Sequence, residues 1–454
     1  MKRTTLYTFL AFFAGASGLL AQLPGDQLWR FAAAGDIYAS PTLGHDGNLY
    51  IGAEDNQLYA IAPDGTLQWA FAAGDFIHSS VALDHAGNLY FGSWDGFLYS
   101  LNPDGELRWK YDLGAFITAT PAVSQNGMVY VGANDGVFYA FSNDGQVLWF
   151  ELSDAPIYGA AAVRPDGAVI FGNEAGRIHA LARDGTTLWT TDVEVVAGRS
   201  NRLRAAISVA ADGTLYVGAG NHRLYALNRD GTVRWTFEAG DIIDSAPVVD
   251  SGGDVLFGSR DGYLYKLNKA GLLQWLVAVG DVFYASPAVD AADNVYLAGF
   301  QGSGVTRLFS FDPAGVVRWT LDFSGLNDSS PLLTGDGHLY LGMYNGGLYK
   351  VRTAAGPAAS AWPQYGRNAA RQGSRDHVQP PVFTVQQAQA QGGLRLLADG
   401  VFGVRGRVLS ASNPSLPFTQ WTILEEHTFL GEALEVLDPA AAGAVQRFYT
   451  VVIP

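Results

Sequence analysis

The feature that most constrains the fold is a tryptophan that returns at a nearly fixed interval. Eight tryptophans are spaced 40, 40, 40, 40, 46, 40 and 44 residues apart, and each follows a glycine four positions earlier, as in APDGTLQW and NRDGTVRW. They are Trp29, Trp69, Trp109, Trp149, Trp189, Trp235, Trp275 and Trp319. A fixed period of this length indicates a repeat protein, in which each unit packs against its neighbours.

A second pattern inside each unit predicts β-strands. Segments such as NLYFGSWDGFLYSL and DVLFGSRDGYLYKL alternate aromatic and aliphatic residues around a turn rich in Asp, Asn and Gly, which is typical of a β-hairpin. A short strand of small residues precedes each hairpin, as in FYASPAV, and the tryptophan lies in a fourth strand. Four strands in each unit of this length predict an all-β, eight-bladed β-propeller of four-stranded blades.

The two ends of the repeat indicate how the ring closes. Residues 26–31 have the glycine-to-tryptophan spacing of an outermost strand, but no inner strands precede them. The last unit, from Leu339 to Val351, lacks a well-spaced outer strand of its own. We therefore expect residues 26–31 to complete the eighth blade, which also removes exposed sheet edges.

The chain begins with the pattern of a secretory signal peptide. Lys2 and Arg3 precede an apolar run from Leu6 to Leu20, so we expect residues 1–21 to be removed and the mature protein to be secreted or periplasmic. A membrane anchor is the alternative, but the run is short and no second one follows. The sequence contains no cysteine, so we expect no lipid anchor, and no membrane-spanning segment after cleavage.

We expect the propeller to occupy residues 22–373, followed by a linker at 374–381 and a small C-terminal β-domain at 382–454. The period breaks after the last repeat, where Trp362 follows Gly356 by six residues, and Pro380 and Pro381 mark the boundary. Segments such as GRVLSAS and RFYTVVIP alternate in the manner of strands, which favours a small β-sandwich. The net charge of −15 argues against nucleic acid and anionic lipid as partners. We expect a monomer.

The repeated motif G-x-x-D-G-x-L-Y-A-L followed by D-G-x-x-x-W resembles the β-propellers built of pyrroloquinoline quinone (PQQ)-type repeats, over residues 26 to about 351. That family contains quinone-dependent dehydrogenases and also non-enzymatic scaffolds, such as an assembly factor for outer-membrane barrels. The resemblance implies that the repeated tryptophan braces neighbouring blades.

The dehydrogenases of this family use a disulfide of adjacent cysteines and a Ca²⁺ held by Glu, Asn and Asp. This sequence has no cysteine, and no motif places the calcium ligands. It is therefore closer to the scaffold branch, and we expect no cofactor, with PQQ and Ca²⁺ left as the alternative. The eight histidines never approach the spacing of metal ligands, so no metal site is predicted. His179 takes the place of a repeated tyrosine and is interpreted as a core residue.

Comparing the units with one another gives a candidate binding site. Positions that vary between units are free for function. One of them lies two residues before the Ser-Pro dipeptide, or its equivalent, that precedes the innermost strand. The eight copies are Tyr38, His78, Thr118, Tyr158, Arg204, Asp244, Tyr284 and Asp328. Because innermost strands line the channel, we expect a ring of polar groups near one mouth. It suits a small polar ligand such as a sugar, held by stacking and hydrogen bonds; a structurally neutral, water-filled lining is the alternative.

The fifth unit carries an insertion, VVAGRSNRLRAA, that brings several arginines together. Arg199, Arg202 and Arg204 would suit the binding of a carboxylate or phosphate, although a loop that neutralises nearby aspartates has the same composition.

The leading interpretation is a secreted or periplasmic scaffold that binds protein or carbohydrate through its channel mouth and loops. The alternative is an enzyme acting in the channel, either a quinone-dependent alcohol or sugar oxidoreductase or a carbohydrate-active hydrolase or lyase, for which Asp244 and Asp328 are a possible carboxylate pair.

Overall fold

The structure, a computed structural model, describes residues 23–281, 284–360 and 363–366, together with six C-terminal strands. The predicted signal peptide at 1–21, Trp362 and the predicted linker at 374–381 lie outside the described residues. Within the described part of the chain, all regular secondary structure is β-strand. No helix of that part is long and apolar enough to cross a membrane.

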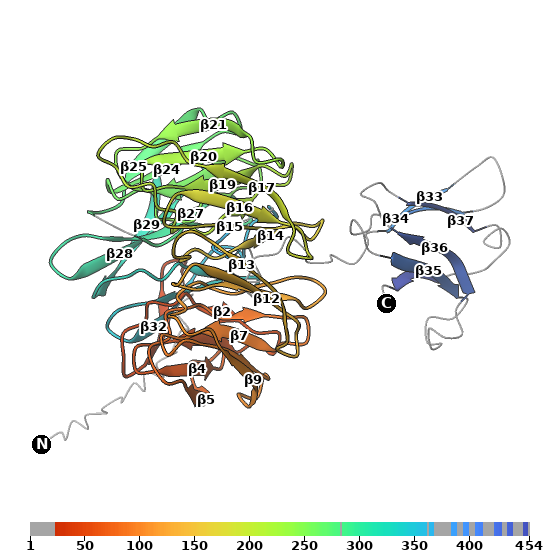
Figure 1. Ribbon diagram of the computed structural model, residues 1–454, viewed down its shortest axis with the longest axis horizontal. Coiled ribbons are helices and arrows are strands. Elements are labelled where there is room, and N and C mark those ends of the chain that lie inside the picture. The colour runs from red at the N-terminus through yellow and green to blue at the C-terminus, as the bar shows by residue number, and fades with distance from the viewer. Residues whose placement is uncertain are drawn as a thin grey trace, which may run out of the picture.

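The main body is a ring of eight four-stranded antiparallel sheets, as predicted (Figure 1). In each sheet, the short strand innermost in the ring comes first in the chain, except where the ring closes. The strands of the first four blades are β2 (Thr42–Leu43), β3 (Leu49–Gly52), β4 (Gln57–Ile61), β5 (Leu67–Ala72); β6 (Ala82–Leu83), β7 (Leu89–Gly92), β8 (Phe97–Leu101), β9 (Leu107–Asp112); β10 (Ala122–Val123), β11 (Val129–Gly132), β12 (Val137–Phe141), β13 (Val147–Leu152); β14 (Ala162–Val163), β15 (Val169–Gly172), β16 (Arg177–Leu181) and β17 (Thr187–Asp192).

The remaining blades repeat this order. Their strands are β18 (Ser208–Val209), β19 (Leu215–Gly218), β20 (Arg223–Leu227), β21 (Val233–Glu238); β22 (Val248–Val249), β23 (Val255–Gly258), β24 (Tyr263–Leu267), β25 (Leu273–Ala278); β26 (Ala288–Val289), β27 (Val295–Phe300), β28 (Val305–Phe311), β29 (Val317–Ser324); and β30 (Leu332–Thr334), β31 (His338–Gly342), β32 (Gly347–Arg352) and β1 (Gln27–Ala32).

The ring closes as the sequence predicts. Strand β1 pairs antiparallel with β32, placing Trp29 opposite Lys350, so the first strand of the chain is the outermost strand of the last blade. On the other side of this joint, the seventh blade's Trp319 packs on Gly25, where an added Cβ would lie 3.1 Å from the indole. Both ends of the repeat are therefore fixed in the sheet and in the packing between blades.

The spaced tryptophans lie between neighbouring blades. The indole N–H of Trp29 donates to the carbonyl of Pro63 at 3.0 Å, in a turn of the next blade. Gly65 in that turn has a φ of +91°, and an added Cβ would lie 3.0 Å from the ring of Trp29. The equivalent bond is made by the indoles of Trp69, Trp109, Trp149, Trp189, Trp235 and Trp275. The glycine and the tryptophan recur together because the indole covers the turn.

A second repeated glycine brings six of the blades close to the loop that leads into the next. In the second blade, a Cβ added to Gly92 would lie 2.2 Å from Cγ2 of the buried Ile117. This contact fixes the start of the β7–β8 turn against the segment that enters the third blade. The contact between the glycine and the entering loop therefore positions two segments near the channel. These are the turn between the two middle strands and the residues that precede the innermost strand.

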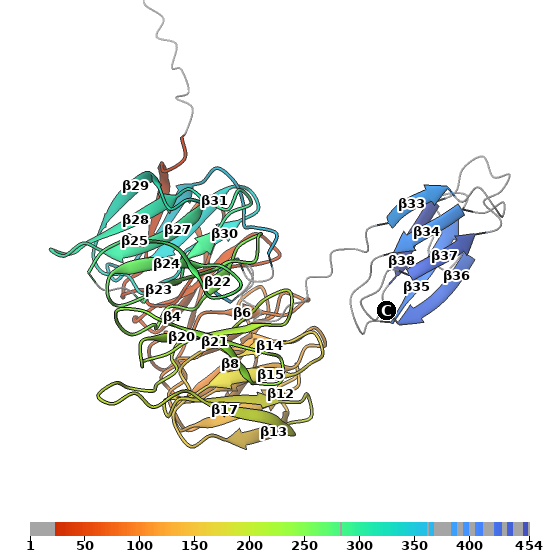
Figure 2. The ribbon, with the colours of Figure 1, turned by 90° about the horizontal axis from the view of Figure 1, so that it is seen from above.

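The C-terminal region contains two three-stranded antiparallel sheets, drawn in blue in Figure 2. The strands are β33 (Phe383–Gln387), β34 (Leu394–Ala398), β35 (Arg405–Ala411), β36 (Thr422–Thr428), β37 (Leu434–Asp438) and β38 (Phe448–Val452). Their order is β33-β34-β37 in one sheet and β36-β35-β38 in the other. These strands agree with an all-β region, and a β-sandwich formed by the two sheets stays a prediction.

Candidate functional site: one mouth of the channel

Seven of the eight ring positions predicted from the sequence lie around one cavity. These seven are Tyr38, His78, Thr118, Arg204, Asp244, Tyr284 and Asp328. The cavity has a volume of about 160 Å³. The eighth position, Tyr158, is not part of its lining, and the guanidinium of Arg204 lies 4.8 Å from the centre of the Tyr158 ring. Comparing repeat units therefore located a real depression at the centre of the ring.

Aromatic side chains form one side of this mouth. Tyr38 lies between Tyr344 and His78, with ring centroids 4.0 and 4.4 Å away. The ring centroids of His78 and Trp94 are 4.5 Å apart. Trp94 stacks on Phe116, with ring centroids 5.4 Å apart. We call these five residues, which come from the eighth, first, second and third blades, the aromatic rim. Phe116 at its end is 53% exposed, so the rim presents an apolar surface to solvent.

Charged side chains form the other side of the mouth. The carboxylate of Asp244, whose side chain is only 4% exposed, accepts from Arg260 at 2.6 Å and from Arg202 at 3.3 Å. The guanidinium of Arg260 also lies 4.3 Å from the centre of the Tyr284 ring. In the neighbouring blade, Arg204 binds Glu174 through two nitrogens, at 2.6 and 3.3 Å. The charges on this side are thus arranged in pairs.

These contacts bear on the predicted stacking of a sugar on tyrosine. Both faces of Tyr38 are occupied, by Tyr344 and His78, and Tyr158 and Tyr284 each carry an arginine over the ring. Recognition of a ligand here would therefore rely on hydrogen bonds more than on open aromatic faces.

A second set of variable residues lies at the β-turn that joins the two middle strands of each blade. Glu54 accepts from His78 at 2.9 Å, Asn134 accepts from Thr118 at 3.2 Å, and Tyr344 donates to Asp328. With Trp94, Glu174 and Arg260, these residues complete the mouth, and the sequence analysis missed them. A signal was present, because each follows the repeated Gly of the hairpin by two residues.

Burial shifts the pKa values of several groups at the mouth. It raises the pKa of Asp328, against the opposing effects of the hydrogen bond from Tyr344 and the charge of Arg260. Burial also lowers the pKa of His78, while Glu54 acts in the opposite direction. The pKa of Asp36 is raised by burial and by the nearby charge of Glu54. At neutral pH, the aromatic rim is therefore bordered by acidic groups and contains a neutral imidazole.

Below the mouth, hydroxyl groups join the blades. The backbone N–H of Ser40 donates to Ser80 Oγ at 2.9 Å, and that of Ser80 donates to Thr120 Oγ1 at 3.2 Å. The same bond links Ala246 to Ser286, Ser286 to Ser330 and Ser330 to Ser40. This hydroxyl belt is interrupted where alanines replace the hydroxyl residues, at Ala160, Ala206 and Ala246.

Tyr365, from the segment after the last blade, lies at that interruption. Its ring packs against Ala160, Ala206 and Ala246, and its hydroxyl lies 3.0 Å from Thr120 Oγ1. Gln364 beside it is fully buried and accepts from the backbone N–H of Leu333 at 2.8 Å. Because Tyr365 also lines the cavity, it forms the floor beneath the mouth.

The arginines of the insertion each have a carboxylate partner. Arg199 donates to Glu238 at 3.0 Å, Arg202 pairs with Asp244, and Arg204 pairs with Glu174. An anion bound between them would compete with these pairs, and anion binding at this loop stays a prediction. His179 is a core residue as interpreted, 5% exposed and stacked on Phe171 at 4.7 Å.

The residues at the mouth do not fit a quinone site with calcium. Within the described part of the chain, no three His, Asp or Glu side chains are grouped as a metal ion would require. The carboxylates that line the cavity are bonded to arginines or to Tyr344, and the sequence offers no cysteine.

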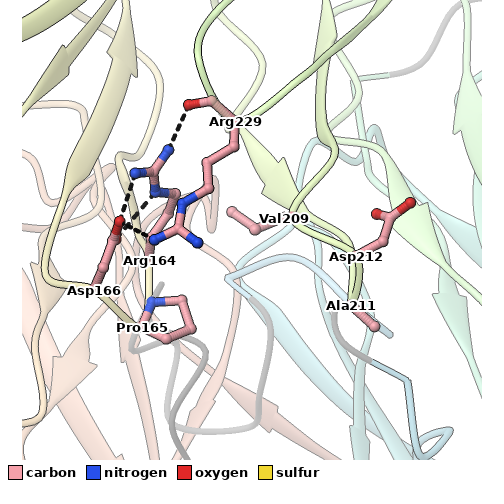
Figure 3. A pocket seen from close by; sticks show the side chains of 8 residues that line it. Arg164, Pro165, Asp166, Val209, Ala211, Asp212 and Arg229 are labelled. Carbon is pink, nitrogen blue, oxygen red and sulfur yellow. Dashed lines mark hydrogen bonds and ion pairs between the residues drawn. The ribbon is translucent and has the colours of Figure 1, made fainter. Parts of the chain in front are cut away.

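A separate pocket of about 230 Å³ lies between turns of the fourth and fifth blades (Figure 3). Arg164, 7% exposed, donates to Asp166 and to the carbonyl of Arg229. That carbonyl also accepts from the indole of Trp189. The guanidinium of Arg229 forms an ion pair with the carboxylate of Asp166 at 2.5 Å. The polar groups of Arg164 are thus used to join two blades, and we interpret this cluster as structural.

Comparisons with known proteins agree on the architecture. The family model described as outer membrane protein assembly factor BamB matches residues 62–183 and 174–362. Among solved structures, BamB from Moraxella catarrhalis is similar at 18% identity with a TM-score of 0.60, covering 72% of this chain and 99% of that one. No curated protein matches the sequence significantly.

A computationally designed protein, Ika8, is also similar, at 16% identity with a TM-score of 0.58, covering 72% of this chain and 100% of that one. Because a designed protein matches about as well as a natural one, these structural likenesses show the fold and not the activity.

Proposed function

Because the chain belongs to the family described as outer membrane protein assembly factor BamB, we propose that it is a non-enzymatic scaffold that binds a protein partner in outer-membrane protein assembly. It would act in the periplasm as a monomer, without a cofactor, after removal of residues 1–21. The observation that carries this proposal is the aromatic rim, which presents apolar surface at one mouth of an otherwise acidic molecule.

The rim has the composition of a protein-binding surface. Tyrosine, tryptophan and phenylalanine are enriched where proteins meet, because they bury much apolar area at a small entropic cost. Trp94 and Phe116 are held by stacking at 5.4 Å, so little order has to be gained on binding. The loops that carry them are fixed at their bases by contacts such as that of Gly92 with Ile117.

The charges beside the rim indicate the chemistry of the partner. Glu54 bonds to His78, Asp36 lies close enough to Glu54 for its pKa to be raised, and Asp75 acts on His78 electrostatically. Acidic groups around an apolar row favour a partner segment with apolar residues flanked by Lys or Arg.

Site-specific crosslinking in the native host tests this proposal. A photo-crosslinking amino acid is placed at Phe116 on the rim or, as the matched control, at Phe150 on β13 of the same blade, where the side chain is 60% exposed. We expect a component of the outer-membrane assembly machinery to be crosslinked from position 116 and not from 150. Crosslinks to that component from 150 alone, or to no envelope protein from either position, would contradict the proposal.

Carbohydrate recognition at the cavity is a second candidate, favoured by its hydroxyl and carboxylate lining. A glycoside-cleaving activity is its enzymatic form, because Asp328 has a raised pKa while Asp244 is paired with two arginines, and catalytic carboxylate pairs need such different environments. Release of reducing sugar from polysaccharides, abolished in Asp328→Asn, would support the enzyme; its absence across a polysaccharide panel would leave binding alone.

A further inference from the structure

We infer that three neighbouring turns on the face opposite the mouth contact a phospholipid membrane whose head groups are zwitterionic. These turns, which we call the apolar turns, are residues 268–273 of the sixth blade, 312–317 of the seventh blade and 23–26 at the closure of the ring. The inference goes beyond the proposed function, because it concerns another face of the propeller and a lipid surface instead of a protein.

The apolar turns lie at the ends of the strands that are farthest from the mouth. In each blade, the turn between the two middle strands faces the mouth, and the next turn, which leads into the outermost strand, lies at the opposite end of the third strand. In the sixth blade, Arg260 is in the first of these turns and residues 268–273 form the second. A membrane at this face therefore leaves the aromatic rim free to bind a protein.

The turn into the outermost strand is not the same in all blades. In the first five blades it reads Asp-Gly followed by a polar residue, whereas in the sixth and seventh it reads Ala-Gly followed by Leu or Val. The sixth blade has Ala270 and Leu272, and the seventh has Ala314 and Val316. The corresponding pairs in the first five blades are Asp64 and Thr66, Asp104 and Glu106, Asp144 and Gln146, Asp184 and Thr186, and Asp230 and Thr232. Two neighbouring turns therefore lack the acid and carry an apolar tip.

The geometry of the turn does not require this difference. In the first blade, Asp64 accepts from the N–H and the hydroxyl of Thr66, and these bonds lower the pKa of Asp64, so the turn carries a negative charge at neutral pH. In the sixth blade, Asn268 Oδ1 holds the turn by accepting the N–H groups of Ala270 and Leu272, both at 3.0 Å. The fold thus tolerates a charged turn at this position, and the apolar tips indicate a contact made by the surface.

The tips of the apolar turns are exposed. Leu272 and Val316 are 64% and 61% exposed, and Leu23 at the closure is 63% exposed. Leu273 and Val317, the next residues of the chain, are also exposed. Exposed aliphatic side chains that occur together mark a surface that binds something.

Tryptophans hold the three turns next to one another. The carbonyl of Pro313 in the seventh blade accepts the indole N–H of Trp275 in the sixth at 3.0 Å. Gly25 at the closure packs on Trp319 of the seventh blade, and Figure 2 shows the start of the described chain, in red, beside β29. The tips therefore follow one another along one edge of the ring.

The charges beside the tips fit a zwitterionic surface. Residues 23–27, 268–274 and 312–318 contain two cations, Lys269 and Arg318, and two carboxylates, Asp26 and Asp312. This edge has no net charge, although the chain carries −15. The carboxylate of Asp312 accepts from backbone N–H groups of its own turn. Lys and Arg beside apolar groups suit a membrane surface, where the chain of the side chain is buried and the charge meets the head groups.

The residue types favour lipid over a protein partner. The tips contain only Leu and Val, whereas protein interfaces depend most on Trp, Tyr and Arg and use Leu and Val less. Aliphatic side chains enter hydrocarbon without needing a surface of complementary shape. The position of the chain start agrees with this: the apolar run predicted as part of the signal peptide ends at Leu20, three residues before Leu23. A signal peptide lies in the membrane until it is removed, so this edge of the ring is next to the membrane during export.

Flotation with phosphatidylcholine vesicles tests the inference on residues 22–454. We expect the parent to bind the vesicles. A variant with Ala270→Asp, Leu272→Thr, Ala314→Asp and Val316→Thr has the turn sequence of other blades and should fold, and we expect its partition coefficient to fall at least tenfold. Leu148→Thr, which removes an exposed leucine from the outermost strand of the third blade, is the matched control and should bind like the parent.

The absence of cysteine from the sequence allows a second test that does not depend on the turn variant. A single cysteine is introduced by Val316→Cys or, as the control, by Thr66→Cys at the equivalent position of the first blade, and is labelled with an environment-sensitive fluorophore. We expect vesicles to shift the emission to shorter wavelength for the label at position 316 and to leave it unchanged at position 66.

Three results would overturn the inference: a parent that does not float with the vesicles, a folded turn variant that binds as well as the parent, or equal emission shifts from both labelled positions. Self-association of the parent that the turn variant abolishes, without binding to vesicles, would assign the apolar turns to a second copy of the chain and would overturn it as well. Sedimentation velocity of both proteins measures that self-association.

Discussion

The hydroxyl of Tyr365 lies 3.0 Å from Oγ1 of Thr120, so a residue that follows the eighth blade is bonded to the third blade inside the channel. Tyr365 also covers the three alanines at which the hydroxyl belt is interrupted. The segment after the ring is therefore part of the propeller and contributes to its stability.

Substitution of Tyr365 should separate packing from hydrogen bonding. Tyr365→Phe keeps the ring and removes the bond to Thr120, so we expect a loss of about 1 kcal/mol or less in the free energy of unfolding. Tyr365→Ala also exposes the alanines, and a loss of about 2–3 kcal/mol is expected. Urea denaturation measures both values. A Tyr365→Ala variant as stable as the parent would show that the segment does not stabilise the ring.

Two tryptophans with different positions should respond differently to truncation. Trp69 lies between blades and donates to Pro103 at 3.0 Å, whereas Trp94 lies in the aromatic rim. We expect Trp69→Ala to cost about 3 kcal/mol and Trp94→Ala about 1 kcal/mol or less. Thermal unfolding of the two variants and the parent gives the comparison. Equal losses would contradict the assignment of Trp94 to binding and of Trp69 to the fold.

Two arginines share the carboxylate of Asp166 but differ in burial. The Arg164 side chain is 7% exposed and that of Arg229 is 63% exposed. Arg164→Gln removes the buried guanidinium from the carbonyl of Arg229 and from the carboxylate of Asp166. These groups keep the bonds from Trp189 and from the Arg229 side chain, so we expect a loss of about 2 kcal/mol. Arg229→Gln should cost about 0.5 kcal/mol, as for an exposed ion pair. Chemical denaturation of both variants tests the order, and the reverse order would contradict the structural role given to Arg164.

The imidazole of His78 provides a prediction about pH. Burial lowers its pKa from the ordinary value of 6.5, and Glu54 opposes this shift. Because the folded state holds the proton less tightly than the unfolded state, the contribution of His78 to stability is present above pH 6.5. It is lost as the pH falls through the lower pKa of the folded state.

Nuclear magnetic resonance of the imidazole measures this directly. We expect His78 to titrate below pH 6.5 in the parent and at a still lower pH in Glu54→Gln, which removes the favourable carboxylate. A pKa above 6.5, or one that rises in Glu54→Gln, would contradict the environment described for the rim.

The fold was predictable because the repeat provides many copies of the same physical requirement. Each indole packs on a turn where only glycine leaves room for the ring, as Trp29 packs on Gly65. The last unit lacks an outer strand of its own, and this absence indicated that β1 closes the ring. The ring of channel residues followed from the same comparison of units, although Tyr158 lies outside the cavity lining.

Other features of the site could not be predicted in this way. The pairing of Arg204 with Glu174 and of Asp244 with Arg260 depends on how two loops meet in space, which the spacing of residues does not encode. Tyr365 lies outside the period, so no other unit contains a copy with which it could be compared. For the same reason, the sequence could not show that other side chains cover the ring faces of Tyr38, Tyr158 and Tyr284.

The content of proteins in the outer membrane of a deletion strain tests the central claim most directly. The strain is complemented with the parent, with a Trp94→Ala, Phe116→Ser variant of the aromatic rim, or with Phe150→Ser on the outer strand of the third blade. If the protein is a scaffold that binds through its rim, the parent and Phe150→Ser restore the outer-membrane proteins, while the rim variant, present at the same level, does not. Full restoration by the rim variant would contradict the account.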